Sequence, residues 1–360
     1  MTEAMKSAIC LVPGDGVGQE VIPATAEVLA ALGLGLNFVE ARAGFEHFQR
    51  TGNAIPDETL ADVAAAGAAL FGATASPSTT VEGYRSPILV MRRTFDLYAN
   101  LRPAASLPGS FSRPNINLLI VRENTEGLYA GRERREDEAA IAERLITRKA
   151  SERIARVAFE QARKRMADGG ASNQHSAFSN PTPLCFGDCR HQSSVTIVHK
   201  ANVLKLTDGL FREACFKVAA EFPEVQVNEM LVDAMAMRLV RDPESFDVIV
   251  TTNLFGDILS DEAAGLIGGL GVAPSANLGE RVAVFEPVHG SAPDIAGQGI
   301  ANPIGAILSA ALLLDHIGQP AAAERVRQSI NATLAQGMLP RDLGGTATTA
   351  DVTRATIKNL

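Results

Sequence analysis

Two aspartates spaced four residues apart are the feature of this sequence that most directly suggests chemistry. Asp257 and Asp261 lie in the stretch Asn-Leu-Phe-Gly-Asp-Ile-Leu-Ser-Asp, which follows the apolar run 248–251. Residues with this spacing share one face of a helix, and open α/β sheets bind ligands where their strands end. Carboxylate oxygens on one face suit Mg²⁺ or Mn²⁺, and Asp233 completes the set if the fold or a second subunit brings it close. Acids that favour the start of a helix are the alternative interpretation.

Four arginines near apolar segments form a second candidate set. They are Arg92, Arg93, Arg102 and Arg122. An unpaired charge beside apolar chain is costly, and guanidinium groups bind carboxylates in bidentate geometry. The set therefore predicts a substrate with several carboxylates, and structural ion pairs with nearby acids are the alternative. Because Arg92 and Arg93 are adjacent, we expect only one of them to face inward.

A tyrosine and a lysine are candidates for proton transfer. Tyr129 is one of three tyrosines in the chain and lies in Glu-Gly-Leu-Tyr-Ala-Gly, whereas Lys200 ends the predicted strand 195–199. A lysine near cations or a metal ion loses its proton closer to neutral pH. Neither stretch proves a role by itself.

Two glycine-containing stretches are weaker signals of a nucleotide site. The turn 14–18, Gly-Asp-Gly-Val-Gly, follows a predicted strand but lacks the Gly-x-Gly-x-x-Gly spacing, so by itself it indicates a tight turn. The stretch 286–297 is dense in small residues, which let the backbone approach a ligand closely. His289 within it is suited to stack on or bond an adenine, and a core histidine is the alternative.

Apolar runs alternate with helical patterns along most of the chain. We expect strands at 8–12, 36–41, 68–71, 118–121, 195–199, 225–231, 248–251 and 282–286. We expect helices at 20–32, 56–66, 150–167, 208–221, 257–266, 303–317 and 321–334. This alternation predicts an α/β fold with a largely parallel sheet that places the candidate residues at strand ends.

Length and composition narrow the class of protein. The 360 residues suggest about two domains, and 46% hydrophobic with 21% charged residues is typical of a globular chain. A net charge of -8 gives no electrostatic footprint for nucleic acid or for an anionic membrane. The longest apolar run, 304–314, is too short to span a membrane and predicts a buried helix. Four cysteines and no signal segment favour a reduced, cytoplasmic protein.

The segment 168–194 interrupts the alternation of strands and helices. It is rich in Ser, Asn, Gly and Pro, and we interpret it as an inserted surface loop. Cys185, Cys189 and His191 lie within it, but their spacing fits no strong zinc pattern. We therefore expect no metal there.

Together these segments resemble the β-decarboxylating dehydrogenases that act on isocitrate, homoisocitrate and 3-isopropylmalate. The stretch 253–271, with Asn-Leu-Phe-Gly-Asp-Ile-Leu-Ser-Asp and Gly-Gly-Leu-Gly, carries the resemblance most specifically. It implies an isopropylmalate-dehydrogenase-like fold, in which residues 1–98 and 268–360 form a large domain with a mixed sheet from both chain ends. Residues 99–267 would form a smaller α/β dimerisation domain, with a clasp arm near 128–147 and the inserted loop.

The resemblance also implies roles for individual residues in a homodimer with shared active sites, a tetramer being possible. Asp257 and Asp261 of one subunit would bind the metal, whereas Asp233 and Lys200 would come from the other subunit. Tyr129 and Lys200 would be catalytic with Asp233, Tyr129 protonating carbon after CO₂ leaves and Lys200 helping to remove the hydroxyl proton. The substrate would be held by Ser86, Arg92, Arg102, Arg122 and Asn202. The cofactor would be held by Glu286, His289, Gly290, Ser291, Ala292, Asp294, Ile295 and Asn302.

The cofactor can be predicted from two of these positions. Relatives that use NADP have Lys and Tyr where this sequence has Asp294 and Ile295. A carboxylate accepts hydrogen bonds from ribose hydroxyls and repels a 2′-phosphate. We therefore expect NAD.

The substrate can be predicted from the stretch Tyr-Arg-Ser-Pro-Ile-Leu-Val-Met-Arg at 84–92. Isocitrate enzymes usually have Ser and Asn here, whereas this sequence has Ser86 and Ile88. Ser-Pro-Ile resembles fungal-type homoisocitrate dehydrogenases, so conversion of homoisocitrate to 2-oxoadipate, a step of lysine biosynthesis, is the first expectation. Isocitrate follows, then 3-isopropylmalate or tartrate. A regulatory subunit is the remaining alternative, although such subunits tend to lose the Tyr, Lys or metal acids present here.

Overall fold

The computed structural model describes residues 8–75, 77, 79, 81–167 and 193–360. The predictions made for the segment 168–192, including Cys185, Cys189 and His191, lie outside these residues. The chain divides into two compact units. The first unit contains Met1–Arg102, Leu107–Arg113 and Ala264–Leu360, and the second contains Pro103–Ser106 and Pro114–Ala263.

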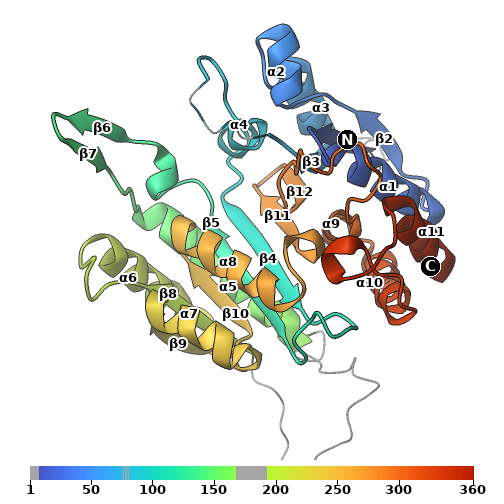
Figure 1. The fold of residues 1–360 in the computed structure, drawn as a ribbon. Coiled ribbons are helices and arrows are strands. Elements are labelled where there is room, and N and C mark those ends of the chain that lie inside the picture. Colours follow the sequence, from blue (N-terminus) through green and yellow to red (C-terminus); the bar gives the residue numbers. More distant parts are fainter. Residues whose placement is uncertain (1–7, 76, 78, 80, 168–192) are drawn as a thin grey trace, which may run out of the picture. The chain divides into compact units, whose positions relative to one another are not determined.

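The first unit is built on a mixed sheet made from both ends of the chain (Figure 1). Its strands run in the order β2 (Asn37–Glu40), β1 (Ala8–Gly14), β3 (Ala68–Ala73), β12 (Ala283–Pro287), β11 (Pro274–Leu278) and β4 (Ala99–Ala105). The first four are parallel, and β11 is antiparallel to both of its neighbours. β3 and β12 therefore end at the same edge of the sheet, where parallel strands present their ligand-binding loops.

The helices of the first unit are α1 (Gly18–Ala31), α2 (Phe45–Thr51), α3 (Asp57–Ala66), α4 (Pro87–Thr94), α9 (Ile304–His316), α10 (Pro320–Ala335) and α11 (Thr349–Asn359). Of these, α1, α3 and α9 pack against the sheet, whereas α10 and α11 pack on other helices. The predicted buried helix is confirmed as α9, which packs on β3, β11 and β12 as well as on α1 and α10. Thr348 and Asp351 form a capping box that fixes the start of α11.

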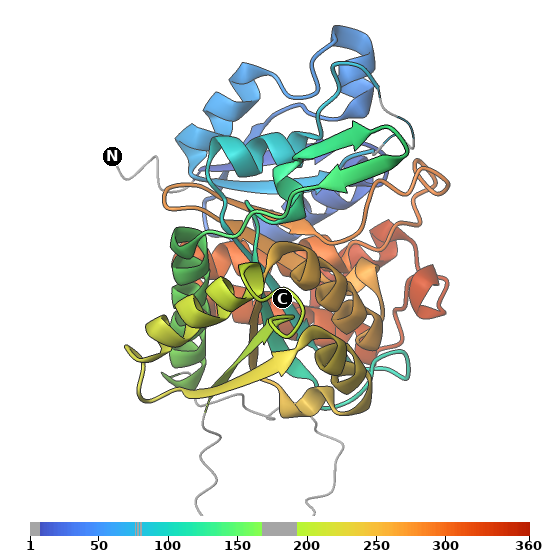
Figure 2. The ribbon, with the colours of Figure 1, turned by 90° about the vertical axis from the view of Figure 1, so that its left-hand side faces the viewer.

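The second unit contains a parallel sheet with the order β5 (Asn117–Glu123), β10 (Val248–Thr251), β8 (Ser194–His199) and β9 (Gln226–Leu231). Its helices are α5 (Arg148–Ala167), α6 (Thr207–Ala219), α7 (Val232–Arg241) and α8 (Asn253–Leu266), the last of which ends in the first unit. An antiparallel hairpin of β6 (Glu133–Glu136) and β7 (Ala139–Ala142) projects from this unit and points toward the viewer in Figure 2.

The predicted α/β fold class is confirmed, and one helix boundary and one missed helix concern the site. α8 begins at Asn253, four residues before its predicted start, so Asp257 lies in its second turn. The strand predicted at 225–231 is observed as β9, and the helix that follows it, α7, was not predicted and holds Asp233 in its first turn. Among the described residues, no helix is both long enough and apolar enough to cross a membrane.

Candidate active site

Arg122 is the centre of a polar cluster in the second unit. It lies in β5 and is 1% exposed, and its Nε and Nη2 donate to Asn253 Oδ1 at 3.0 and 2.7 Å. Its Nη1 pairs with Asp257. A Cβ added to Gly256 would lie 2.6 Å from Arg122 Cγ, so the arginine stem fills the space that any larger residue needs. The Asn-x-x-Gly-Asp segment of α8 therefore cradles one guanidinium group.

Tyr129 joins this cluster through Asp257. Its hydroxyl donates to Asp257 Oδ2, and the guanidinium carbon of Arg122 lies 5.1 Å from the centre of its ring. Burial raises the pKa of Tyr129, the hydrogen bond and the charge of Asp257 raise it further, and Arg122 opposes them. The phenol is therefore protonated at neutral pH, as a proton donor must be.

Lys200 and Asp233 form a separate pair in the same unit. Lys200 Nζ lies 2.5 Å from Asp233 Oδ1, and this hydrogen bond lowers the pKa of Asp233. The side chain of Asp233 is 65% exposed, and Asp261 is also exposed. No group of three or more His, Cys, Asp or Glu side chains among the described residues is placed to hold a metal ion. Within one chain the fold does not bring Asp233 to Asp257 and Asp261.

A cavity of about 150 Å³, open to solvent, lies in the first unit, at the edge where β3 and β12 end. Its lining residues are Phe71, Gly72, Ala73, Thr74, Ile88, Arg92, Arg102, Glu286, Pro287, Val288, His289 and Gly290. Arg92 and Arg102 are 9% and 8% exposed, whereas Arg93 is exposed, so one of the adjacent arginines faces inward. The residues at the end of β3 were not among the predicted site residues, although their position after a buried strand is the signal that points to them.

Buried amides and a carboxylate hold these two arginines. Arg92 Nη2 lies 3.1 Å from Glu286 Oε1, which also accepts from Asn277 Nδ2 at 2.8 Å. Arg102 Nε donates to Asn100 Oδ1 at 2.8 Å, and Asn100 in turn donates to Asn277 Oδ1 at 3.1 Å. Glu286, predicted as a cofactor ligand, thus contacts the arginine predicted to hold substrate. Asn100 and Asn277 were missed, although asparagines inside apolar strands are the signal for such a network.

The loop 288–303 between β12 and α9 contains most of the predicted cofactor ligands, and we call it the adenosine loop. The glycine turn 14–18 packs on this loop. Val17 N donates to Ser291 O at 2.9 Å, and a Cβ on Gly16 would lie 2.1 Å from that oxygen. The turn therefore needs glycine at position 16 in order to pack on the loop. His289 Nε2 is buried and has no hydrogen-bond partner among the described residues, and burial lowers the pKa of this imidazole. A neutral ring with an unused nitrogen lines the cavity.

Beyond Ser291 the same loop turns outward and returns to the core. Ala292 has a φ of 39°, and Ile295 N donates to its carbonyl at 3.1 Å. Asp294 is exposed. Asn302 is buried, accepts from Ile304 N at 3.0 Å and donates to Asp342 Oδ2 at 3.0 Å, so it anchors the start of α9.

Helix α4 presents the residues predicted to select the substrate. Ile88 and Arg92 lie one turn apart on this helix and both line the cavity. Ser86 precedes the helix and is not among the lining residues, and Leu89 is 38% exposed. Asn202, the other predicted substrate ligand, is exposed in the turn after Lys200. Of the residues predicted to select the substrate, Ile88 is therefore the one that lines the cavity beside Arg92.

The fold and the arrangement of these groups agree with comparisons to known proteins, which indicate a class of decarboxylating oxidoreductases. The family model for isocitrate/isopropylmalate dehydrogenase matches residues 8–173 and 186–356. The chain belongs to the isocitrate/isopropylmalate dehydrogenase family and is a β-decarboxylating dehydrogenase. The resemblance drawn from the sequence is thereby confirmed.

Individual relatives carry several different names. An isocitrate/homoisocitrate dehydrogenase of Thermus thermophilus is 52% identical over 356 residues, covering 99% of each chain. A 3-isopropylmalate dehydrogenase of Methanothermobacter thermautotrophicus is 47% identical over 358 residues, again covering 99% of each chain. The crystal structure of an isocitrate dehydrogenase from Methylococcus capsulatus superposes with a TM-score of 0.87 at 41% identity, covering 98% of each chain. The family uses NAD(P) and a divalent metal, and these names leave the substrate open.

Proposed function

We propose that this chain catalyses the NAD-dependent oxidative decarboxylation of a 2-hydroxy tricarboxylate, with homoisocitrate preferred and isocitrate as the alternative. The observation that supports this substrate class is the pair of buried arginines, Arg92 and Arg102, in the wall of one cavity. Guanidinium groups bind carboxylates through parallel N–H donors. The network of Glu286, Asn277 and Asn100 orients both groups before substrate arrives, which lowers the entropic cost of binding.

The preference for homoisocitrate rests on Ile88. An isoleucine in the cavity wall offers no amide to the distal carboxylate of isocitrate, and a longer substrate places that carboxylate elsewhere. A missing buried hydrogen bond changes affinity by roughly 1–3 kcal/mol. The relative from Thermus thermophilus, named for both substrates, supports either choice.

Proton transfer is assigned to Lys200 and Tyr129. Lys200, as the neutral amine, helps to remove the proton of the substrate hydroxyl, and its Nζ lies beside the carboxylate of Asp233. Tyr129 returns a proton to carbon after CO₂ has left, and its raised pKa keeps that proton available at neutral pH. Arg122, which lies beside Tyr129, binds a substrate carboxylate in this proposal.

The residues of the adenosine loop fit NAD. The unused Nε2 of His289 is a hydrogen-bonding atom that a bound adenine would satisfy. The exposed carboxylate of Asp294 is free to accept from ribose hydroxyls and would repel a 2′-phosphate. NAD, when bound, accepts the hydride from the substrate.

The donor chemistry of Asp257 and Asp261 fits Mg²⁺ or Mn²⁺, which prefer oxygen ligands. Asp257 has two oxygens already oriented by Arg122 and Tyr129. Asp233 is the third proposed ligand and comes from a second copy of the chain. The bound metal stabilises the negative charge that develops as CO₂ leaves.

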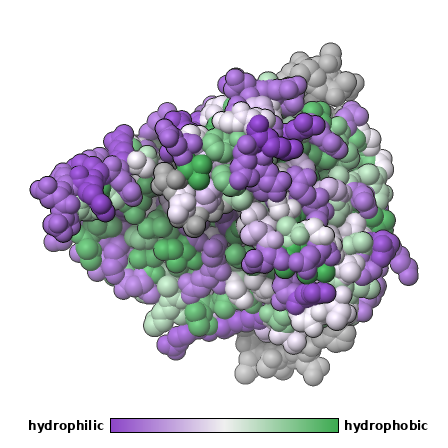
Figure 3. All heavy atoms as spheres, turned by 45° about the horizontal axis from the view of Figure 1, so that its top comes forward, coloured by the Kyte–Doolittle hydropathy of each residue, from purple (hydrophilic) through white to green (hydrophobic). Residues whose placement is uncertain are grey.

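A homodimer is supported by apolar side chains exposed on the second unit. Val203 and Leu206, which follow Lys200, are 66% and 88% exposed, and Met237, Val240 and Ile258 on α7 and α8 are more than half exposed. In Figure 3, hydrophobic side chains gather beside the hydrophilic projection at the left, which is the β6–β7 hairpin. Such a surface is typical of a subunit interface, because exposed apolar patches favour association.

The experiment that tests this proposal compares kcat/KM for homoisocitrate and isocitrate, each with NAD and Mg²⁺. A ratio above about ten in favour of homoisocitrate supports the proposed pocket. A preference for isocitrate assigns the enzyme to that substrate and removes the role given to Ile88. Turnover of 3-isopropylmalate alone would contradict both choices.

A further inference from the structure

The end of β8 that leads to Lys200 is fixed by a fully buried carboxylate. Asp208, in the first turn of α6, is 0% exposed, and its Oδ2 accepts from Lys200 N at 2.6 Å. Its Oδ1 pairs with Arg144. Burying a carboxylate is costly unless it is paired and hydrogen-bonded, so this one is kept by its two partners. The backbone of Lys200 is therefore fixed by an ion pair rather than by strand pairing alone.

Arg144 is itself held at several points. Its Nη1 donates to Thr207 Oγ1 at 3.2 Å, and its Nη2 donates to Thr252 Oγ1 at 2.9 Å. Its guanidinium carbon lies 5.1 Å from the centre of the Phe255 ring. Arg144 follows β7 in the chain, so the base of the hairpin is tied to the starts of α6 and α8.

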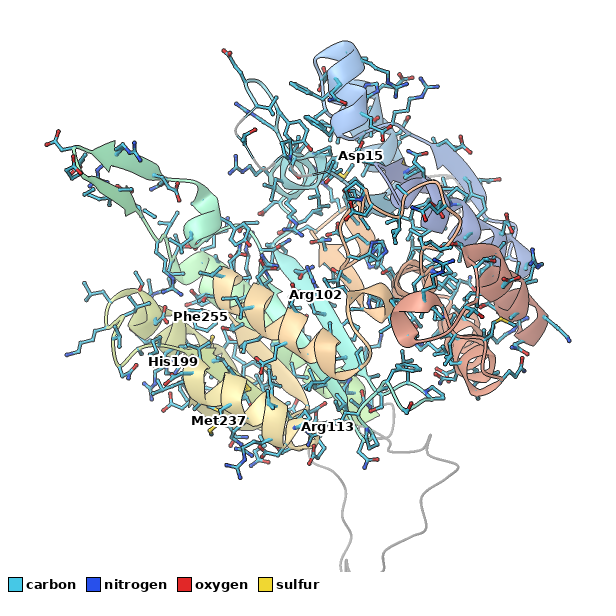
Figure 4. All side chains as sticks on the ribbon, in the orientation of Figure 1. Asp15, Arg102, Arg113, His199, Met237 and Phe255 are labelled. Carbon is cyan, nitrogen blue, oxygen red and sulfur yellow. The ribbon has the colours of Figure 1, made fainter. Side chains whose placement is uncertain are left out.

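A second side chain fixes the residue after Lys200. His199, 4% exposed, accepts from Ala201 N through Nδ1 at 3.2 Å, and its Nε2 lies 3.2 Å from Glu229 Oε2. Glu229 is bound in turn by Arg212, which lowers the pKa of Glu229. His199 lies at the end of β8 that faces the hairpin (Figure 4). Both backbone N–H groups around the lysine side chain thus have buried acceptors.

We propose that Asp208, backed by Arg144, is a positioning residue that holds Lys200 for proton transfer. This inference rests on the proposed function, which assigns Lys200 that role. A lysine side chain has four rotatable carbons, so a fixed Cα restricts where its ammonium group can reach. Neutralising Asp208 leaves Arg144 without its charge partner and weakens the acceptor for Lys200 N. A displacement of about 1 Å at a reacting group costs on the order of 100-fold in rate.

The opposite end of β8 offers a matched control. Asp247 pairs with Arg165, whose Nε lies 2.5 Å from Asp247 Oδ1, and accepts from Ser194 N at 3.2 Å. Both carboxylates thus pair with an arginine and accept a backbone N–H of β8 or of its flanking residue. Only Asp208 does so at the residue proposed to move a proton.

The test compares Asp208→Asn, Asp247→Asn and Lys200→Gln in the full-length enzyme, with homoisocitrate or isocitrate, NAD and Mg²⁺. We expect Asp208→Asn to lower kcat by about 10- to 100-fold with KM within about twofold. Asp247→Asn should keep kcat within about twofold even if both variants melt earlier. Amide exchange in residues 200–206 should rise in Asp208→Asn and stay unchanged in Asp247→Asn.

Equal kcat values for Asp208→Asn and Asp247→Asn would overturn the positioning role of Asp208. Unchanged amide exchange in residues 200–206 of Asp208→Asn would overturn it as well. An active Lys200→Gln variant overturns the role of the lysine and the inference together, whereas an inactive one beside a fully active Asp208→Asn overturns the inference alone. Absence of turnover by the wild type refutes the proposed function, and amide exchange then decides whether Asp208 fixes this backbone. If Asp208→Asn does not fold, Arg144→Lys replaces it, and a normal kcat in that variant counts against the inference.

Discussion

The first and second units hold their buried arginines in different ways. In the first unit, Arg92 and Arg102 are oriented by Glu286, Asn277 and Asn100 and face a cavity. In the second unit, Arg122 is held by Asn253 and by Asp257, the carboxylate that also accepts from the tyrosine proposed to donate a proton. In the first unit, the side chains that orient the arginines have no proposed part in proton transfer. In the second unit, Asp257 both holds the arginine and contacts the proposed proton donor. Changes at Arg92 or Arg102 in the first unit should therefore alter substrate binding, and changes at Tyr129 in the second should alter the rate of chemistry.

The largest effect is expected for Tyr129→Phe. Removing the hydroxyl removes the proposed proton donor, so kcat should fall by about 10²- to 10⁴-fold, with little change in KM. Tyr84→Phe is the matched control, because Tyr84 is also half-buried but donates to the carbonyl of Ala75 at 2.8 Å. Steady-state kinetics of both variants measure the difference. A Tyr129→Phe enzyme with more than half of the wild-type kcat would remove Tyr129 from the chemistry.

The pH dependence of kcat gives a second test of Tyr129. The proposed acid must be protonated, and its pKa is raised above the ordinary value of 10.0 by burial and by Asp257. The midpoint of its proton loss should therefore lie above pH 10, and Tyr129 should cause no fall in kcat between pH 7 and about 9. An alkaline inflection in that range that disappears in Tyr129→Phe would contradict this.

Substitution of the first-unit arginine should change binding instead. Arg92→Lys keeps the charge but loses the planar fork, so KM for the tricarboxylate should rise by about 10- to 100-fold while kcat changes less. Arg93→Lys is the control, because the neighbouring Arg93 is exposed. A fall in kcat at unchanged KM would show that binding and chemistry are not divided between the units.

The sequence predicts the residue types in both units, but it predicts contacts only between residues that are close together in the chain. The Asn-x-x-Gly-Asp segment, Arg122 and Tyr129 were all singled out as residue types with chemical potential, and the fold class followed from the alternation of apolar runs. The partner of Arg92 was not predictable, because Glu286 lies 194 residues away in the chain. Pairings of this kind are decided by which strands become neighbours, and periodicity in one segment carries no information about that.

Local patterns also failed where a tertiary contact overrides propensity. The helix was predicted at 257–266, directly after Gly256, a residue type that disfavours helix interiors. The structure begins the helix at Asn253, because the stem of Arg122 packs where a side chain at 256 would stand and Asn253 binds its guanidinium group. The acidic residue expected at the helix start therefore lies one turn further in, where it reaches both Arg122 and Tyr129.

A smaller effect is expected for Ile88→Asn, which sharpens the account of the cavity. The new amide supplies the polar group that Ile88 lacks, so the ratio of kcat/KM for homoisocitrate to that for isocitrate should fall by about tenfold. Leu89→Asn is the control on the same helix, since Leu89 is 38% exposed and does not line the cavity. An equal change in both variants would mean that helix stability, and not the cavity wall, sets the preference.

The smallest effect is expected where exposed ion pairs join α5 and α6 of the second unit. Lys217 Nζ lies 2.8 Å from Glu152 Oε1, and the lysine side chain is 63% exposed. Exposed pairs contribute little because water and salt screen them and side-chain entropy opposes them, so Lys217→Ala should lower the melting temperature by less than about 3 °C. Its kcat and KM should equal those of the wild type. A change in kcat here, comparable to that of Tyr129→Phe, would show that the second unit responds as a whole, and its chemistry could then no longer be assigned to the cluster around Asp257.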